Sequence, residues 1–287
     1  MSFGPKPWQQ TSWDWRAAGN FIGGGAGSGL IVITALAGVK GTAAVALLLA
    51  GLALVGLGLG CVWLELGRPL RALHVFFNPR VSWMTREAIA ATVLFPVGVA
   101  AAAGVYGGMA GLAWLPAALA LVFVYCQGRM LRAARGIIAW REPLMLPLLI
   151  GTSLAEGAGL FYLMLPWHGQ GGTARAVMFG VLVLARAALW LSYRRHLAGR
   201  MAVRANRALD RAGRVLLIGG TAVPLALLLV AQGAGGGSVA ALGAVAGLAA
   251  ALAGGYLKFT LITRAGYNQG FALQEIPVRG ARWSSNA

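Results

Sequence analysis

Long apolar runs separated by short polar segments dominate the chain and predict eight membrane-spanning helices. Each run holds about twenty residues with few charges, which is the length an α-helix needs to cross the hydrocarbon core of a bilayer. The sequence is 59% hydrophobic and only 11% charged, which excludes an ordinary soluble domain. We therefore expect an all-α polytopic membrane protein, built as one integral domain over residues 1–287. The predicted spans are 17–39, 43–64, 88–108, 109–127, 143–165, 174–193, 215–232 and 239–263.

The polar segments between the spans are unequal on the two sides of the predicted bundle. Residues 65–87 contain prolines and arginines but remain apolar enough to lie at a membrane interface. Two basic loops, 128–142 and 194–214, and a polar tail, 264–287, fall on the same side. The turns on the other side are short and rich in glycine. A partner protein should therefore dock on the basic side.

Positive charge indicates the orientation in the membrane. All but four of the 24 lysines and arginines fall in segments on one side of the predicted bundle. The positive-inside rule places that side, with both termini, in the cytoplasm, and we expect the bacterial inner membrane. The net charge of +17 is explained by membrane topology and by attraction of the basic segments to anionic lipid headgroups, so a nucleic-acid partner need not be invoked.

The histidines and cysteines argue against a redox centre in this chain. A b-type haem needs axial ligands inside the spans, but His74, His168 and His196 all fall in predicted connecting segments. Cys61 and Cys126 lack the paired spacing of iron–sulfur or structural zinc sites. We predict no haem, no iron–sulfur cluster and no metal site in this chain.

Four short motifs follow one another in an order that is typical of one family. The opening span, with its run of glycines at 20–30, and the expected eight helices agree with the same family. The motifs are LELGRPLRA at 64–72, SWMTRE at 82–87, YCQGRMLRA at 125–133 and TRAGYNQGFALQEIPVRG at 263–280. Together with the opening span they resemble the membrane anchor subunits of the dimethyl sulfoxide reductase type, which belong with the NrfD and polysulfide-reductase anchors.

The resemblance implies a three-subunit oxidoreductase. A catalytic subunit with a molybdenum or tungsten bis-pterin (molybdopterin) would pass electrons along the 4Fe-4S clusters of a four-cluster, ferredoxin-like subunit. The anchor would exchange two electrons and two protons with ubiquinone or menaquinone. A cytoplasmic basic face suits oxidation of a substrate such as phenylacetyl-CoA, whereas sulfoxide, polysulfide and tetrathionate reductases remain alternatives.

Glu87 is the first candidate for proton exchange with a quinone. A carboxylate at the membrane edge beside an apolar pocket can accept or deliver a proton, and the resemblance ties the acid of this motif to quinol binding. Its alternative role is to complement the dipole in the first turn of the third span. Gly67 and Arg71 match the same quinone-binding motif, although Arg71 could equally contact lipid phosphate. Glu65 replaces a histidine common in such anchors, which leaves the donor to the quinone oxygen open.

Glu156 is the second candidate because it stands near the centre of the fifth span, where a charged carboxylate is costly. Arg186 should lie several ångströms nearer the basic side, so we expect no base at the depth of Glu156. Glu156 should then be protonated or face a wet cavity, as part of a proton path or the deep wall of a quinone pocket. A neutral acid bonded to a neighbouring helix is the alternative. Asn20, Trp83 and Tyr125 are further candidates for quinone contacts.

Two other classes of protein remain open. A proton-coupled transporter would also use a buried acid, but it should show broken helices or an internal repeat, and the sequence shows neither. A purely structural tether would need no polar pocket. Quinone binding, solute flux and assembly distinguish the three.

Overall fold

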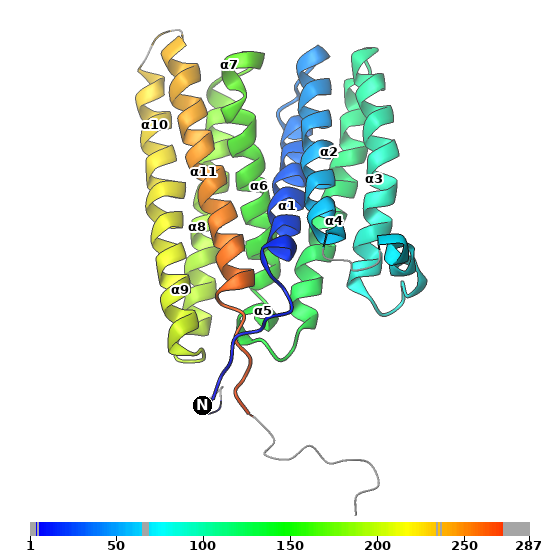
Figure 1. Cartoon of the computed structure of the whole chain (residues 1–287). Coiled ribbons are helices and arrows are strands. Elements are labelled where there is room, and N and C mark those ends of the chain that lie inside the picture. Colours follow the sequence, from blue (N-terminus) through cyan, green and yellow to red (C-terminus); the bar gives the residue numbers. More distant parts are fainter. Residues whose placement is uncertain (1–3, 5, 65–68, 234, 236, 272–287) are drawn as a thin grey trace, which may run out of the picture.

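The computed structural model is a bundle of eight long helices joined mostly by short connections (Figure 1). It describes residues 4, 6–64, 69–233, 235 and 237–271. Within them, eight helical segments are long and apolar enough to cross a membrane, which confirms the predicted fold class and number of spans. They are α1 (Trp15–Leu36), α2 (Gly41–Trp63), α3 (Trp83–Tyr106), η2 with α4 (Ala110–Ala133), α6 (Met145–Leu163), α8 (Thr173–Leu197), α9 to α10 (Val203–Gln232) and α11 (Gly237–Thr263).

The predicted connecting segments 65–87, 128–142 and 194–214 are all partly helical, and the second contains the end of α4 and the short helix α5 (Ile138–Arg141). The third span begins at Trp83 rather than at residue 88, because Ser82 caps it by accepting a hydrogen bond from the backbone N–H of Thr85 at 3.3 Å. Before it lies a short 3-10 helix, η1 (Pro69–Phe77). The loop predicted at 194–214 ends in a helix, α9 (Val203–Arg214), which buries its apolar face.

The seventh span is not a regular α-helix throughout. A π-helical stretch, η3 (Val215–Ala222), joins α9 to α10 (Val223–Gln232). Its wider turn leaves backbone carbonyls free for other donors, and such turns occur often at functional sites.

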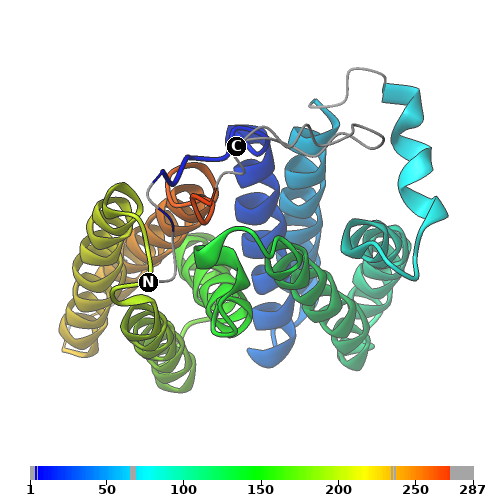
Figure 2. The same ribbon diagram turned by 90° about the horizontal axis from the view of Figure 1, so that it is seen from below.

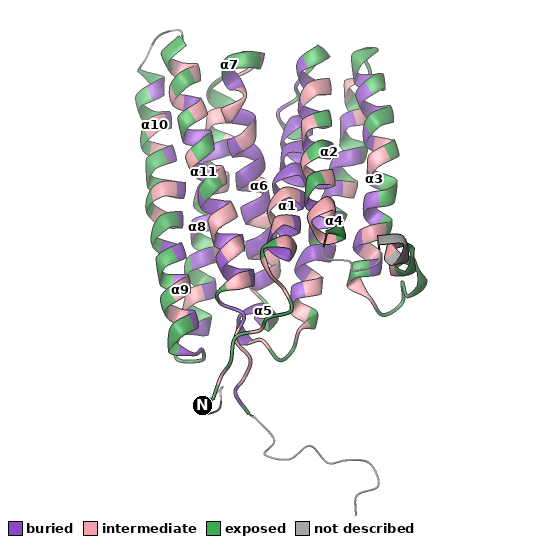
Figure 3. Ribbon diagram, in the orientation of Figure 1, coloured by how far each residue is buried: buried purple, intermediate pink, exposed green. Residues whose placement is uncertain are grey.

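Helix α1 lies at the centre of the bundle. It packs against α2, α4, α6 and α11, and with α6 it buries the largest share of its length (Figures 2 and 3). Glycines allow this close approach, as expected where small residues replace the hydrophobic force between helices. A Cβ atom at Gly29 of α1 would overlap the backbone carbonyl of Ser153 in α6, and one at Gly157 would overlap Gly29 in return.

The segments before α1 and after α11 pair with each other. Gln9 forms an antiparallel bridge with Tyr267, and the backbone N–H of Asn268 donates to the carbonyl of Trp8 at 3.0 Å. Both segments lie at one end of the bundle (Figure 1). We call it the arginine-rich end, because it carries Arg80, Arg86, Arg129, Arg132, Arg135, Arg141, Arg194, Arg195, Arg200, Arg204, Arg207, Arg211, Arg214 and Arg264.

Candidate functional site

Glu87 points from α3 toward α1 and is only 4% exposed. Its Oε1 atom accepts a hydrogen bond of 3.0 Å from Nδ2 of Asn20. Because α3 begins at Trp83 and Ser82 makes the cap, Glu87 lies beyond the first turn. The alternative role of Glu87 in the first turn of its own helix is therefore wrong. The structure instead joins two predicted site residues, Glu87 and Asn20, from different helices.

A third helix supplies a polar group that the sequence analysis missed. Gln127 of α4 is fully buried, and its Nε2 donates to the backbone carbonyl of Asn20 at 3.1 Å. The amide fits because a Cβ at Gly24 would lie only 2.8 Å from Nε2. Within the described residues, Oδ1 of Asn20 and Oε1 of Gln127 accept no hydrogen bond. A glutamine followed by glycine late in an apolar run was the available signal.

A cavity of about 660 Å³ adjoins this polar group, between α2, α3 and η1. Its volume falls within the range of small-molecule sites, which are mostly apolar with a few polar groups. Asn20 supplies an amide group and Glu87 a carboxyl group to its wall. Trp63 and Leu73 also line it and are largely exposed, so the cavity reaches the outer face of the bundle. Other lining residues include Leu59, Val62, Phe76, Met84 and Phe95.

Trp83 and Tyr125, two predicted contacts of the quinone, do not line this cavity. The ring of Trp83 packs against the guanidinium groups of Arg86 and Arg129, at 4.1 and 4.4 Å from the ring centroid. The hydroxyl of Tyr125 accepts a hydrogen bond of 2.9 Å from Nη1 of Arg129. Both instead hold arginines at the arginine-rich end by cation–π and hydrogen-bonding contacts.

The motif that precedes η1 is only partly described. Glu65 and Gly67 lie outside the described residues, so their predicted roles stay predictions. Arg71 belongs to η1, and its side chain likewise lies outside the description. Its neighbour Ala72 lines the cavity, which brings the backbone of this segment to the site.

Glu156 forms a second buried cluster, and here a prediction fails. Nζ of Lys258 in α11 lies 2.5 Å from Oε2 of Glu156 and 3.1 Å from Oγ of Ser153. The expectation that no base shares the depth of Glu156 was wrong. A lysine side chain reaches more than one helical turn from its Cα, so depth along the helix underestimates its reach. Gly254 leaves room for the carboxylate, since a Cβ there would lie 2.6 Å from Oε1.

Arg186 of α8 completes this second cluster. It is fully buried, and Nη1 donates to the carbonyl of Ala250 in α11 at 2.9 Å. Nη2 donates to the carbonyl of Gly220, in the π-helical stretch η3. Among the described atoms, Nε of Arg186 and Oε1 of Glu156 have no hydrogen-bond partner. We call Arg186, Glu156 and Lys258 the interior charge cluster.

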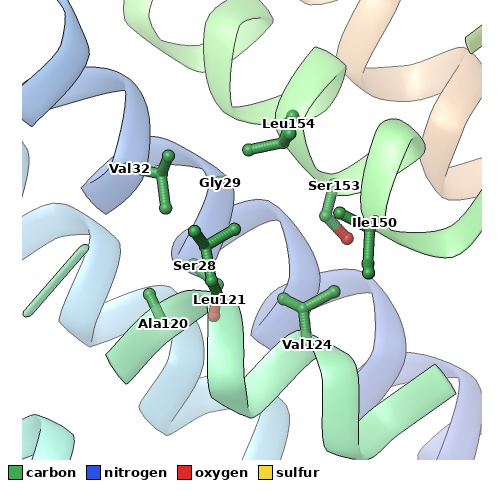
Figure 4. Close-up of a pocket in the computed structure, with 9 residues that line it drawn as sticks. All are labelled: Ser28, Gly29, Val32, Ala120, Leu121, Val124, Ile150, Ser153 and Leu154. Atoms are coloured by element: carbon green, nitrogen blue, oxygen red, sulfur yellow. The ribbon is translucent and has the colours of Figure 1, made fainter. Parts of the chain in front are cut away.

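A narrow crevice lies between the helices that carry the two clusters. Ser28 and Ser153 line it, together with apolar side chains from α1, α4 and α6 (Figure 4). It holds no space that would admit a water molecule. Packed side chains therefore fill the contact between α1, α4 and α6 at this level of the bundle.

No protein-family model matches the chain, and no curated protein matches it. The fold itself defines a class, that of all-helical, multi-pass membrane proteins with eight candidate spans.

Proposed function

We propose that this chain is the membrane anchor and quinone-binding subunit of a molybdenum or tungsten bis-pterin oxidoreductase complex. One observation carries the proposal: a buried Glu87, hydrogen-bonded to Asn20, faces a largely apolar cavity of about 660 Å³. The likeness of the motifs around Glu87 to quinone-binding anchors supports the same reading. The subunit would exchange electrons between an iron–sulfur partner and the quinone pool.

The residues of the cavity suit a quinone head group. A bound quinone supplies reversible two-electron, two-proton chemistry. Phe76 and Phe95 offer aromatic surface for a flat ring, and the exposed mouth lets an isoprenoid tail reach lipid. Asn20 and Glu87 line the cavity, and Oδ1 of Asn20 has no hydrogen-bond partner among the described atoms, so this polar group can take part in hydrogen bonds with a head group.

Glu87 would exchange the proton. Asn20 holds Oε1 of the carboxylate by a hydrogen bond of 3.0 Å and so fixes its orientation. Oε2 would then take up or release a proton at the cavity wall, which is the role of a general acid–base. The apolar lining would limit access of bulk water to this oxygen.

The arginine-rich end suits the partner subunits. The Glu87 site lies near it, because Arg86 is the adjacent residue and Arg129 lies on the neighbouring α4. An iron–sulfur subunit docked there would be close to the cavity. By the positive-inside rule, this end, with both termini, would face the cytoplasm from the bacterial inner membrane. Oxidation of a cytoplasmic substrate such as phenylacetyl-CoA, or reduction of a sulfoxide, polysulfide or tetrathionate, would then occur in the catalytic subunit.

Equilibrium binding tests the proposal. Quenching of tryptophan fluorescence should report binding of a short-chain quinone to the purified chain, because Trp63 lines the cavity. We expect Glu87→Gln to weaken binding of the matching quinol, and Glu142→Gln, which alters a carboxylate paired with His196 outside the cavity, to leave it unchanged. A wild-type chain that binds neither quinone nor quinol would overturn the proposal.

A proton-coupled transporter is the second candidate, because the Lys258–Glu156 ion pair is buried within the spans. The crevice between α1, α4 and α6 has no space for a water molecule, so no open pathway runs through it. Solute-driven proton flux in vesicles that contain this chain alone would favour the transporter over the anchor.

A further inference from the structure

The interior charge cluster, taken without Glu87, carries an unbalanced positive charge. Four charged side chains are buried within the described spans: Arg186, Lys258, Glu156 and Glu87. The pair of Lys258 and Glu156 is neutral overall wherever its shared proton lies, because either an ion pair or a neutral pair sums to zero. Arg186 keeps its charge, since a guanidinium group is not deprotonated in proteins. The interior charge cluster therefore has a net charge of one positive unit.

The cluster lies close to the Glu87 site across a single helix. A Cβ at Gly24 of α1 would lie 2.8 Å from Nε2 of Gln127, which belongs to the Glu87 site. A Cβ at the next residue, Gly25, would lie 2.6 Å from Oγ of Ser153 and closer still to Nζ of Lys258. Gln127 of the Glu87 site and Lys258 of the interior charge cluster thus lie against consecutive residues of α1, Gly24 and Gly25. Asn20 lies only about 7.5 Å along the helix axis from Gly25.

The surroundings of the cluster screen its charge weakly. The side chains of Arg186 and Lys258 are 0% and 1% exposed, and salt in the solvent has little effect on buried charges. The groups that face the cluster from α1, α6, η3 and α11 are Gly25, Ser153, the carbonyl of Gly220 and Gly254, none of which is charged. Glu87 is the nearest described group in the spans that can supply the missing negative charge.

We propose that the interior charge cluster gives the cavity at Glu87 a preference for negatively charged head groups. The inference rests on the proposed function and specifies the form of ligand that the site favours. When Oε2 of Glu87 takes the proton of a head-group hydroxyl, the ligand O–H bond breaks and a carboxyl O–H bond forms. The negative charge then moves from Glu87 to the ligand oxygen. The sum of charges in the interior stays constant, and the cluster balances it in both states.

A matched pair of ligands isolates this effect. An alkyl-substituted 2-hydroxy-1,4-naphthoquinone is an anion once its hydroxyl ionises, whereas its 2-methoxy counterpart is neutral and of similar shape. The ratio of their dissociation constants, measured by fluorescence quenching on the purified full-length chain, reports the preference for charge. Changes in packing alone alter both constants together, so the ratio separates electrostatics from damage to the fold.

Opposite charge changes should shift the ratio in opposite directions. When the pair is ionised, Lys258→Met removes a positive charge and should reduce the preference for the anion, by on the order of tenfold if the charge lies about 10 Å away at an effective dielectric constant of about 20. Glu156→Gln removes a negative charge and should increase the preference. The double variant should return to the wild-type ratio, and Lys40→Met, at the exposed opposite end, should not change it.

The outcomes separate this inference from the proposed function. Shifts of the same sign in the two single variants, or no shift in either, would overturn the inference and leave quinone binding intact. A wild-type chain that binds neither ligand would overturn the proposed function itself. If Lys258→Met does not fold, Glu156→Gln and the double variant still give the sign of the shift and its cancellation.

Discussion

Lys258 and Glu156 lie 102 residues apart in the chain, and their side chains meet within 2.5 Å in the interior of the bundle. They join α11 to α6, and both side chains are almost completely inaccessible. A buried ion pair does not by itself make a protein more stable than an apolar pair would. Its two members are nevertheless strongly dependent on each other, because either one alone would be an uncompensated charge or an unpaired polar group.

This dependence gives a first prediction for stability. Lys258→Met should lower the free energy of unfolding by about 3–5 kcal/mol, since it leaves Glu156 buried without a partner. The double variant Lys258→Met with Glu156→Gln should recover most of that loss. Denaturant unfolding in detergent micelles measures both, with exposed Lys40→Met as the control. A double variant that is less stable than the single one would contradict the prediction.

A second prediction concerns the orientation of Glu87. Asn20→Leu removes the donor to Oε1 and should weaken quinol binding by about tenfold to one hundredfold, as expected for a hydrogen bond to a charged group worth about 1.5–3 kcal/mol. Thr92→Val is the matched control, because Thr92 lines the same cavity but its hydroxyl donates to the carbonyl of Ala88. Equal losses in the two variants would show that Asn20 acts only by filling space.

A third prediction concerns the contact between α1 and α6. Gly29→Ala should destabilise the bundle by about 1–3 kcal/mol, because the new methyl group would overlap the backbone of Ser153, which cannot move like a side-chain end. Gly60→Ala, in α2, meets no atom within 4 Å and should be neutral or up to about 1 kcal/mol stabilising through helix propensity. Thermal unfolding of the two variants compares them directly, and equal midpoints would refute the role of Gly29.

A fourth prediction concerns the pH dependence of stability and involves His168, which lies at the end of the bundle opposite the arginine-rich end. His168 follows the fifth span, and its Nδ1 accepts a hydrogen bond of 3.0 Å from the backbone N–H of Gln170. Burial lowers the pKa of this imidazole below its usual value. The unfolded chain therefore binds a proton more readily, so stability is retained above about pH 6.5 and falls as the pH drops through the folded pKa.

The measurement is the change in unfolding midpoint between neutral and mildly acidic buffer. His168→Gln should make this change smaller, whereas His74→Gln, at an exposed position of η1, should not affect it. If His168→Gln shows the same acid-induced loss of stability as the wild type, groups other than His168 cause that loss.

The sequence predicted the spans well because apolar length is a property of each helix alone. It also predicted Asn20 and Glu87 as separate candidates, but their contact depends on how α1 and α3 pack. The same limit explains the error at Glu156, since the partner Lys258 was visible in the sequence while the reach of its side chain across α11 and α6 was not. Gln127 was missed because the one signal, a glutamine followed by glycine late in an apolar run, has no period or spacing that links it to Asn20.

The errors at the edges have a different physical origin. Hydropathy places the start of a span where charge ends, but Ser82 caps α3 ahead of Arg86 and Glu87. Both charged residues are thus helical, and only Glu87 is turned inward. Trp83 and Tyr125 do not line the cavity and contact neighbouring arginines instead, and their predicted contact with a quinone stays a prediction.

The pairing of Gln9 with Tyr267 has a consequence for biosynthesis. A ribosome synthesises Gln9 long before Tyr267. The segment that contains Gln9 therefore has no pairing partner until the intervening helices have been synthesised. The last residues to be inserted are the ones that close the structure. Premature termination shortly before Tyr267 would therefore leave the spanning helices complete but without the bridge between Gln9 and Tyr267.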